Sequence, residues 1–303
     1  MTDTSEDRVI VDAPTERRNP RTAMIDQVDT SEVVALLLAE EALVPNAVAA
    51  QADAITQAAQ LMVTSIARGG RVHYAGAGTS GRLGVLDAVE LGPTYSVGPE
   101  WIEAHIAGGM GALYVARENS EDDETAARTD LDSVRPGDTV VGLAASGRTP
   151  YVAGALHVAR ERGASTVLVS ANPAASLAPL ADVAILVDTG PEAITGSTRM
   201  KAATAQKIVL NTLSTTAMVR LGRTYSNLMV RMRATNSKLR GRLLTMLTQA
   251  TGLSLTVCDE ALHQADGQLP VALVMLLADC DAAEAREALS GGVSVREALR
   301  RRN

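Results

Sequence analysis

The sequence predicts an α/β fold in which a doubly wound parallel sheet binds its ligand at the carboxyl ends of the strands. Apolar runs of strand length occur at residues 72–75, 138–145, 165–171 and 182–188. Such uninterrupted runs are typical of strands that are buried on both faces of a parallel sheet. Segments with helical periodicity separate the runs, as in βαβ units. Two runs end in loops of small and hydroxyl-bearing residues, which is where α/β sheets bind ligands.

Composition limits the function further. A chain of 303 residues can bury a substantial core, and with 2% aromatic residues and no Phe that core must be aliphatic. The net charge of -7 argues against nonspecific nucleic-acid binding. Residues 1–13 form a polar tail unlike a signal peptide, and no apolar run approaches the roughly 20 residues of a membrane span. We therefore expect a cytoplasmic protein with neither a membrane nor a nucleic acid as its partner.

Metal and disulfide chemistry find little support in the sequence. The two cysteines, Cys258 and Cys280, offer neither a disulfide framework nor a metal-binding pair. The four histidines are scattered without the spacing of metal ligands. We expect no metal site and no cofactor.

The loop after the first apolar run has the pattern of an anion site. Residues 76–82, GAGTSGR, join that run to an amphipathic helical segment. Gly78 and Gly81 let the backbone approach a ligand closely, and the first N–H groups of the helix point at it. Thr79 and Ser80 add hydroxyl donors. A phosphorylated ligand is the first hypothesis.

The same glycines also fit a dinucleotide fingerprint. Gly76, Gly78 and Gly81 have G-x-G-x-x-G spacing, with Glu100 or Glu103 roughly 20 residues further on. Two features oppose that interpretation. Hydroxyl donors fill the gap between the glycines, and the Pro- and Gly-rich interval 92–99 separates the helix from any clear second strand. We favour a phosphosugar.

Two further segments offer hydroxyl groups to an anion. Ser146, Gly147, Arg148 and Thr149 follow the second run and precede a helix over 151–162. A long helix is expected to open within 190–207, with Ser197, Thr198, Arg199 and Lys201 in its first turns. On their own, the two cations would more often face solvent. Serine and threonine at such places often only cap the helix, and this simpler interpretation is the alternative for each of them.

The remaining segments are helical or acidic. The acidic stretch 118–132 fits a solvated helix face capped by Ser120, or else one of its carboxylates turns inward toward Glu90. We predict an N-terminal tail and helices over 1–55 and a ligand-binding domain over 56–222. Ser31 should cap the first of these helices, and a second helix should follow Pro45. The basic cluster of Arg17, Arg18 and Arg21 should be a solvated segment. A C-terminal helical region, 223–303, should begin with a helix over 225–247. The small helical module after Gly252 should serve packing or dimerisation.

Several longer motifs, in order, resemble one family. They are GAGTSGRLGVLDAVE, IAGG, AASGRTPYV, PEAITGSTRMKA and NLMV followed by ATN-KLR-R. They are similar to the motifs of the N-acetylmuramic acid 6-phosphate etherases, which belong to the sugar isomerase (SIS) domain superfamily. The resemblance begins at Thr15 and extends nearly to the C-terminal helices. The resemblance implies a flavodoxin-like SIS fold and a homodimer with its active site near the subunit contact. It implies no metal and no organic cofactor.

The resemblance also implies a reaction and its residues. The family cleaves the D-lactyl ether of N-acetylmuramic acid 6-phosphate to N-acetylglucosamine 6-phosphate and D-lactate, in cell-wall amino-sugar recycling. Glu90 matches the catalytic acid and Glu121 the second active-site glutamate. Val89, Leu91 and Gly92 depart from the Ser, Cys and Pro common beside that acid. An elimination followed by hydration needs one protonated and one ionised carboxyl group, hence two different environments.

We expect the loops to bind the sugar phosphate. The candidate substrate-binding residues are Gly78, Thr79, Ser80, Gly81, Ser146, Gly147, Arg148, Thr149, Ser197 and Thr198. The alternative function is a non-catalytic SIS-domain phosphosugar sensor, which would not need both glutamates. A phosphosugar isomerase would share the ring opening and proton removal but would not explain the etherase-like stretches around Ser197.

Overall fold

The computed structural model describes residues 13–232 and 237–302. The expected N-terminal tail, except for Ala13, and the ATN motif therefore lie outside the described residues. A five-stranded sheet has the order β2-β1-β3-β4-β5, which is that of flavodoxin-like doubly wound folds. The predicted fold class is confirmed. The strands are β1 (Val72–Gly76), β2 (Ile102–Ile106), β3 (Thr139–Leu143), β4 (Ser165–Ser170) and β5 (Val183–Leu186).

Four of the strands arise from the four apolar runs. β1, β3, β4 and β5 pair in parallel, so that Tyr74 lies opposite Val141, and Val141 opposite Val167. Every residue of β1 and β3 is buried. Strands covered on both faces need apolar side chains on both, and this is why the runs lack alternation.

The strand β2 corrects the sequence interpretation, which found no clear second strand after the interval 92–99. Only its end residues, Ile102 and Ile106, are buried, and the three residues between them are half-buried. β2 is an edge strand of the sheet. An edge strand has less apolar surface to bury, and its sequence signal is correspondingly weak.

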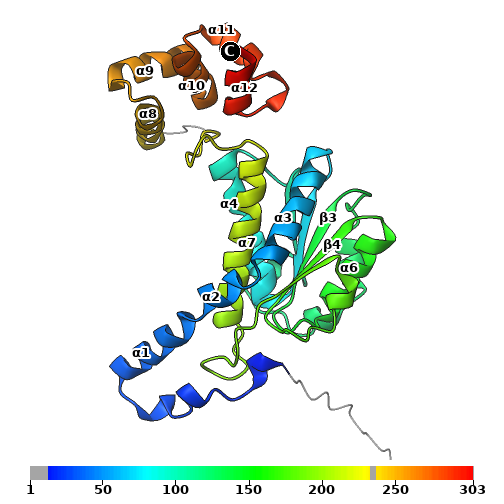
Figure 1. Cartoon of the computed structure of the whole chain (residues 1–303). Coiled ribbons are helices and arrows are strands. Elements are labelled where there is room, and N and C mark those ends of the chain that lie inside the picture. Colours follow the sequence, from blue (N-terminus) through cyan, green and yellow to red (C-terminus); the bar gives the residue numbers. More distant parts are fainter. Residues whose placement is uncertain (1–12, 233–236, 303) are drawn as a thin grey trace, which may run out of the picture. The chain divides into compact units, whose positions relative to one another are not determined.

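Helices cover both faces of the sheet. α3 (Ala52–Ala67) contacts β1, β3 and β5, whereas α6 (Pro150–Glu161) contacts β1, β3 and β4. Figure 1 shows these helices on opposite sides of β3 and β4. α5 (Ala126–Asp130) packs against α6. The core between α6 and the sheet is aliphatic apart from Tyr151, as the composition requires.

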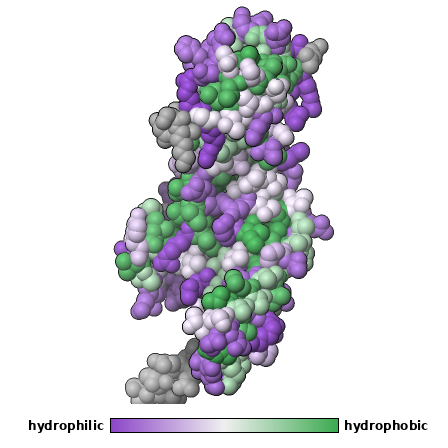
Figure 2. Space-filling view, turned by 90° about the vertical axis from the view of Figure 1, so that its left-hand side faces the viewer, coloured by the Kyte–Doolittle hydropathy of each residue, from purple (hydrophilic) through white to green (hydrophobic). Residues whose placement is uncertain are grey.

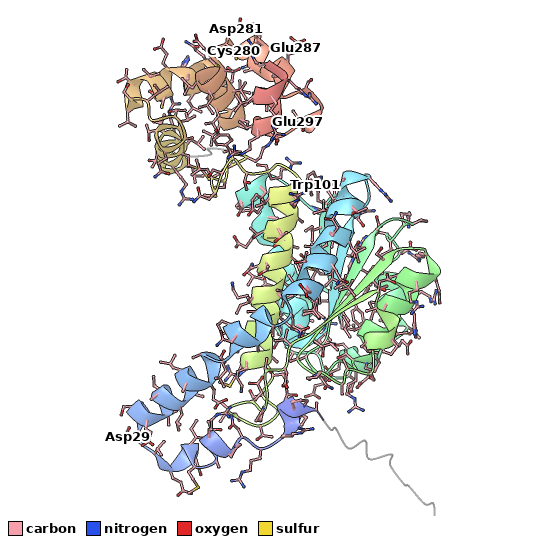
Figure 3. All side chains as sticks on the ribbon, viewed as in Figure 1. Asp29, Trp101, Cys280, Asp281, Glu287 and Glu297 are labelled. Carbon is pink, nitrogen blue, oxygen red and sulfur yellow. The ribbon has the colours of Figure 1, made fainter. Side chains whose placement is uncertain are left out.

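The N-terminal helices form with small differences from expectation. α1 (Thr30–Glu41) is capped by Asp29, whose carboxylate accepts the Glu32 N–H at 2.9 Å, and not by Ser31. Asp29 is labelled in Figure 3. The second expected helix is divided into α2 (Val44–Ala49) and α3. Short 3-10 helices occur at Pro14–Glu16, Pro20–Thr22, Ile25–Gln27, Met110–Leu113, Ser120–Asp122, Ala178–Leu180 and Ser290–Gly292.

The chain divides into two compact units that alternate along the sequence. The first comprises 1–87 and 103–213, and the second 88–102 and 214–303. The helices α4 (Gly78–Tyr95) and α7 (Lys201–Arg220) each run from one unit into the other. The sequence-based division at 55/56 and 222/223 stays a proposal, because it concerns consecutive segments and not contact-defined units.

The second unit has its own core. Its C-terminal helices are α8 (Ser237–Thr251), α9 (Leu255–Gln264), α10 (Leu269–Ala278), α11 (Ala282–Ala288) and α12 (Val295–Arg302). They enclose an apolar cluster that includes Leu247, Leu262 and Leu273. Asp281, labelled in Figure 3, starts α11 with a capping box. Residues 225–232 are not part of the helix expected over 225–247, because Tyr225 and Leu228 pair in an isolated bridge.

Within the second unit, Trp101 of segment 88–102 contacts the C-terminal part of the chain. The Arg223 guanidinium carbon lies 4.1 Å from the centre of the Trp101 ring, in a cation–π contact. Trp101 is labelled in Figure 3. In the described part of the chain, no single helix is long and apolar enough to cross a membrane, although the bent pair 30–49 and 52–67 meets the requirement of length and composition.

Candidate functional site

The two hydroxyl-rich loops flank the point where the order of strands reverses. From β1 the chain goes to β2 on one side, and then crosses to β3 on the other side of β1. Parallel sheets bind ligands at such a switch point, outside the carboxyl ends of the two strands. Residues 77–81 follow β1, and residues 144–149 follow β3, its parallel neighbour. The topology therefore brings together the loops that the sequence selected.

The loop after β1 is shorter than expected, because α4 already begins at Gly78. Gly78 has a φ of +53°, which L-residues rarely adopt. A Cβ on Gly81 would lie 2.5 Å from the carbonyl oxygen of Gly76, so the start of α4 rests directly on β1. Thr79 is half-buried and Ser80 buried in the first turn. The unpaired N–H groups of this helix start are suited to an anion.

The loop after β3 is held by the neighbouring loop after β4. Gly147 has a φ of +69°, and a Cβ there would lie 2.3 Å from the Cβ of Ala175. Its carbonyl oxygen accepts the Leu177 N–H at 3.1 Å. The Asn172 side chain donates to the Ser146 carbonyl oxygen at 3.0 Å. These contacts fix the backbone, and Arg148 is exposed beside it.

Among the described residues, the hydroxyl groups of both loops have no hydrogen-bond partner. Thr149 stands at the N-cap of α6, yet its side chain makes no capping hydrogen bond. Over residues 13–232 and 237–302, no hydrogen bond engages the hydroxyls of Thr79, Ser80 or Ser146 either. The simpler interpretation, helix capping, therefore fails for all four. Donors that the fold does not use are available to a ligand.

The segment before α7 differs from the prediction. α7 begins at Lys201, so Ser197 and Thr198 lie in a turn ahead of the helix and not in its first turns. The Glu192 carboxylate accepts the Lys201 N–H at 3.0 Å and the Ala202 N–H at 2.9 Å. This helix start already holds an anion from the chain itself. Ser197 and Thr198 are half-buried.

Lys201 is fully buried, whereas the sequence suggested a solvent-facing cation. Its Nζ donates to Glu40 Oε2 at 2.7 Å, and the Arg21 Nη2 donates to the same oxygen at 2.9 Å. The Arg21 hydrogen bonds, and then Lys201, lower the pKa of Glu40 to about 2 against the effect of burial. Burial raises the pKa of Glu192. Sequence reasoning could not pair Lys201 with a residue 161 positions away.

The N-terminal segment is fastened to the same loop. Asn19 Nδ2 donates to the Pro191 carbonyl oxygen at 3.2 Å, and the Thr22 hydroxyl donates to the Ala193 carbonyl oxygen at 2.7 Å. With the Glu40 ion pairs, these hydrogen bonds fix the segment that carries Ser197 and Thr198. The basic residue Arg21, read as part of a solvated cluster, is one of its anchors.

Glu90 lies on the exposed face of α4. An α-helix rises about 1.5 Å per residue, so Glu90 is about 15 Å further along α4 than Ser80. Leu86 lies one helical turn before Glu90 and is 49% exposed. Val89 directly precedes Glu90 and is 64% exposed. Residues three and four apart lie on one helix face. Glu90 therefore sits on an apolar helix face that the described residues leave exposed.

Glu121 is exposed in the 3-10 helix Ser120–Asp122, in the segment after β2. Little of the acidic stretch is helical, since α5 covers only Ala126–Asp130. Ser120 donates to the Arg117 carbonyl oxygen and does not cap a helix; Asp123 accepts the Ala126 N–H at 3.0 Å instead. Glu121 has no ion pair in the described part of the chain.

Exposed apolar side chains occur in several places. α1 exposes Val34 and Leu38 by 50% and 65%, one helical turn apart, in addition to Leu86 and Val89 on α4. The face drawn in Figure 2 shows hydrophobic residues in separate patches among hydrophilic ones. Apolar helix faces of this kind commonly mark a protein contact.

The chain is similar to known proteins over most of its length. The model described as "SIS domain" matches residues 117–216, and that described as "Glucokinase regulatory protein N-terminal SIS domain" matches residues 54–160. A protein of Thermobifida fusca called N-acetylmuramic acid 6-phosphate etherase is 55% identical over 268 residues, 88% of each chain. A protein of the same name from Rubrobacter xylanophilus is 49% identical, covering 94% of this chain and 95% of the relative. A third, from Mycolicibacterium smegmatis, is 48% identical, covering 94% and 97%.

Proposed function

Since this chain belongs to the N-acetylmuramic acid 6-phosphate etherase family, we propose that its two hydroxyl-rich loops bind the sugar phosphate and that Glu90 and Glu121 perform the acid–base steps. The chain is a carbon–oxygen lyase, and its substrate is a phosphorylated amino sugar. The product pair is N-acetylglucosamine 6-phosphate and D-lactate, as in amino-sugar recycling from the cell wall.

The unused hydroxyls at the switch point support phosphate binding most directly. Ser80 and Thr79 come from the start of α4, and Ser146 and Thr149 from the loop before α6. A phosphate offers acceptor oxygens to all of these donors and to the N–H groups of the helix start. Gly81 and Gly147 permit the close backbone approach. Ser197 and Thr198 are weaker candidates, because Glu192 occupies the adjacent helix start.

The reaction is an elimination followed by addition of water. Ring opening makes C1 an aldehyde, which acidifies the proton on C2. Loss of that proton and of the C3–O bond forms a C2=C3 double bond, and lactate departs with a proton from the acid. Water then adds its hydroxyl to C3 and a proton returns to C2. Glu90 is the proposed acid; Glu121 is the proposed base for the C2 proton or for water, each such step being worth about 10²–10⁴ in rate.

We propose a homodimer that covers the apolar face of α4. Leu86, Val89 and Glu90 share this face, and the two apolar side chains are about half exposed or more. Association through it would remove water from around Glu90. Burial favours the protonated form of a carboxyl group, which is the form a general acid needs. The proposed location is the cytoplasm, where charged sugar phosphates are retained.

The test is D-lactate release from N-acetylmuramic acid 6-phosphate by wild type, Glu90→Gln and Glu121→Gln. Glu118→Gln is the matched control, since Glu118 is an exposed glutamate of the same segment as Glu121. Loss of release in the first two variants, with phosphosugar binding retained and the control active, supports the assignment. An active Glu121→Gln variant would show that the base lies elsewhere, although the etherase function would stand.

The alternative is a phosphosugar sensor without catalysis. The match to a domain named after a regulatory protein recommends keeping it. The etherase relatives at 48–55% identity over most of the chain favour the enzyme. Tight binding of the phosphosugar without any lactate release would favour the sensor.

A further inference from the structure

Two histidines and a glutamate meet on one side of the sheet, away from the proposed phosphate loops. His73 of β1 and His105 of β2 are stacked, with ring centres 5.4 Å apart. His73 Nδ1 lies 3.2 Å from His105 Nε2 and 3.7 Å from Glu103 Oε2. Glu103 and His105 are two positions apart on one strand and so share a face of the sheet. The proposed reaction uses none of these residues.

The orientation of His73 is fixed by a carboxylate. Its Nε2 lies 3.2 Å from Asp138 Oδ2. That carboxylate also accepts the N–H groups of Arg71 and Arg135, each at 2.7 Å, so it acts only as an acceptor. His73 Nε2 must therefore carry the proton and donate. In the neutral ring, the lone pair is then on Nδ1, which faces His105 and Glu103.

This arrangement matches the support that metal-binding histidines receive. A ligating imidazole usually donates its other N–H to a carboxylate, which sets the tautomer and the ring orientation. Neutral imidazole is the form that binds metal ions.

Glu103 is held in place as a possible third ligand. Its Oε2 accepts hydrogen bonds from Arg71 Nη1 at 3.3 Å and from the Ser133 hydroxyl at 3.1 Å. In the described part of the chain, its Oε1 accepts none. Glu103 is 31% exposed and β2 is an edge strand, so an ion can reach the cluster.

The charge and the distances suit a divalent ion. The charged groups that act on the two rings are Glu103, Asp130, Asp138 and Arg71, three negative and one positive, which sum to -2. The three ligand atoms lie within 4.8 Å of one another. A tetrahedral ion with ligands at about 2.0–2.2 Å separates them by about 3.3–3.6 Å. The observed 3.2 and 3.7 Å lie just below and just above that range.

We propose that His73, Glu103 and His105 form a binding site for a divalent first-row transition-metal ion, Zn²⁺ above all. Two imidazoles and one carboxylate are ligands that Zn²⁺ accepts, with a fourth position for water. The ion joins the edge strand β2 to β1. His73 is the second residue of β1, whereas the phosphate loop follows the last, Gly76. The site is therefore structural, and it steadies the strand that leads to the segment of Glu121.

The test is calorimetric titration of Zn²⁺ into the tag-free, full-length protein after treatment with a chelator. The variants are His105→Ala and Glu103→Gln, both at the accessible edge strand. His263→Ala is the matched control, because His263 is an exposed histidine of α9. Cys258 and Cys280 are free thiols, so all proteins also carry Cys280→Ser, which removes the more accessible one. Circular dichroism verifies that each variant is folded.

We expect one Zn²⁺ per chain in the parent and in the histidine control. Affinity should fall at least about tenfold in His105→Ala and in Glu103→Gln. Zn²⁺ should also raise the midpoint of thermal unfolding of the parent more than that of the two variants, while the rate of D-lactate release stays unchanged. Absence of saturable binding by the parent, or binding by His105→Ala and Glu103→Gln that is as tight as the parent's, would overturn the proposal. The titration needs no substrate, so its result is independent of the etherase reaction.

Discussion

Lys201 Nζ lies 2.7 Å from Glu40 Oε2, and both side chains are removed from solvent. This ion pair joins α7 to α1, and Arg21 completes it. Because the charges are buried, removing one partner leaves the other without compensation. Loss of one partner of such a pair typically costs 3–5 kcal/mol.

Lys201→Met should therefore lower the free energy of unfolding by about 3 kcal/mol, the lower end of that range because Arg21 still pairs with Glu40. Urea denaturation measures the change. Lys207→Met is the control: Lys207 is exposed on the same helix, and its loss should cost less than about 1 kcal/mol. Equal losses in both variants would contradict the role of the buried pair.

The pKa of Glu40 predicts a loss of stability in acid. In the folded protein, the pKa of Glu40 falls from its ordinary value of 4.5 to about 2. A depressed carboxyl pKa stabilises the fold above the unfolded pKa, and this contribution disappears as the pH falls from about 4.5 to about 2. The shift corresponds to about 3 kcal/mol. The stability difference between wild type and Glu40→Gln should shrink over this interval, as urea denaturation at pH 6, 4 and about 2.5 can measure; a constant difference would contradict the assignment.

Gly147→Ala should damage the loop after β3. The added Cβ would lie 2.3 Å from that of Ala175, and the φ of +69° is strained for alanine. Overpacking alone costs about 1–3 kcal/mol. Gly78→Ala is the matched control, since Gly78 also has a positive φ but has no atom within 4 Å of a Cβ. Urea denaturation should show a larger loss for Gly147→Ala, together with a larger fall in kcat/KM.

Ser80→Ala and Ser146→Ala should weaken substrate binding without destabilising the fold, because the fold uses neither hydroxyl. Each lost hydrogen bond to a charged phosphate is worth about 1.5–3 kcal/mol, a rise of about tenfold or more in KM. Ser197→Ala should have a smaller effect, because Glu192 holds the neighbouring helix start. Steady-state kinetics would measure KM, and melting curves of the same variants would measure the stability of the fold. A Ser197→Ala effect larger than the other two would reverse the assignment of the phosphate site.

Val89→Glu should lower the fraction of dimer, since it places a charge on the exposed apolar face of α4. Val115→Glu is the control, because Val115 is 67% exposed outside α4. Analytical ultracentrifugation over a range of concentrations distinguishes the two. Dissociation by both variants, or by neither, would show that the face of α4 is not the subunit contact.

The parts of the fold that the sequence predicted are those governed by local physics. Strands buried on both faces must be apolar throughout, and four such runs became β1, β3, β4 and β5. The two hydroxyl-rich loops were predicted from the small and hydroxyl-bearing residues between a strand and a helix. The edge strand β2 was missed, because three of its five residues are only half-buried and polar or small residues occur there.

The features that could not be predicted depend on distant parts of the chain. Glu40 and Lys201 are 161 positions apart, so nothing local indicates that the lysine is buried. In the sequence, His73 and His105 do not have the spacing of metal ligands. They lie close together only because β2 is the neighbour of β1 in the sheet. The start of α7 was misjudged, because the anion at that end is Glu192 of the preceding loop. The catalytic roles of Glu90 and Glu121 were assigned from the family resemblance and stay a prediction.

Because the two units alternate along the sequence, no single cut in the chain separates them. Trp101 belongs to an excursion of 15 residues, 88–102, into a unit otherwise built from 214–303. A fragment that starts at residue 214 would lose the Trp101 ring on which Arg223 stacks. A fragment that ends at residue 213 would still carry the excursion without its partners. Neither fragment therefore contains all the residues of one unit and none of the other.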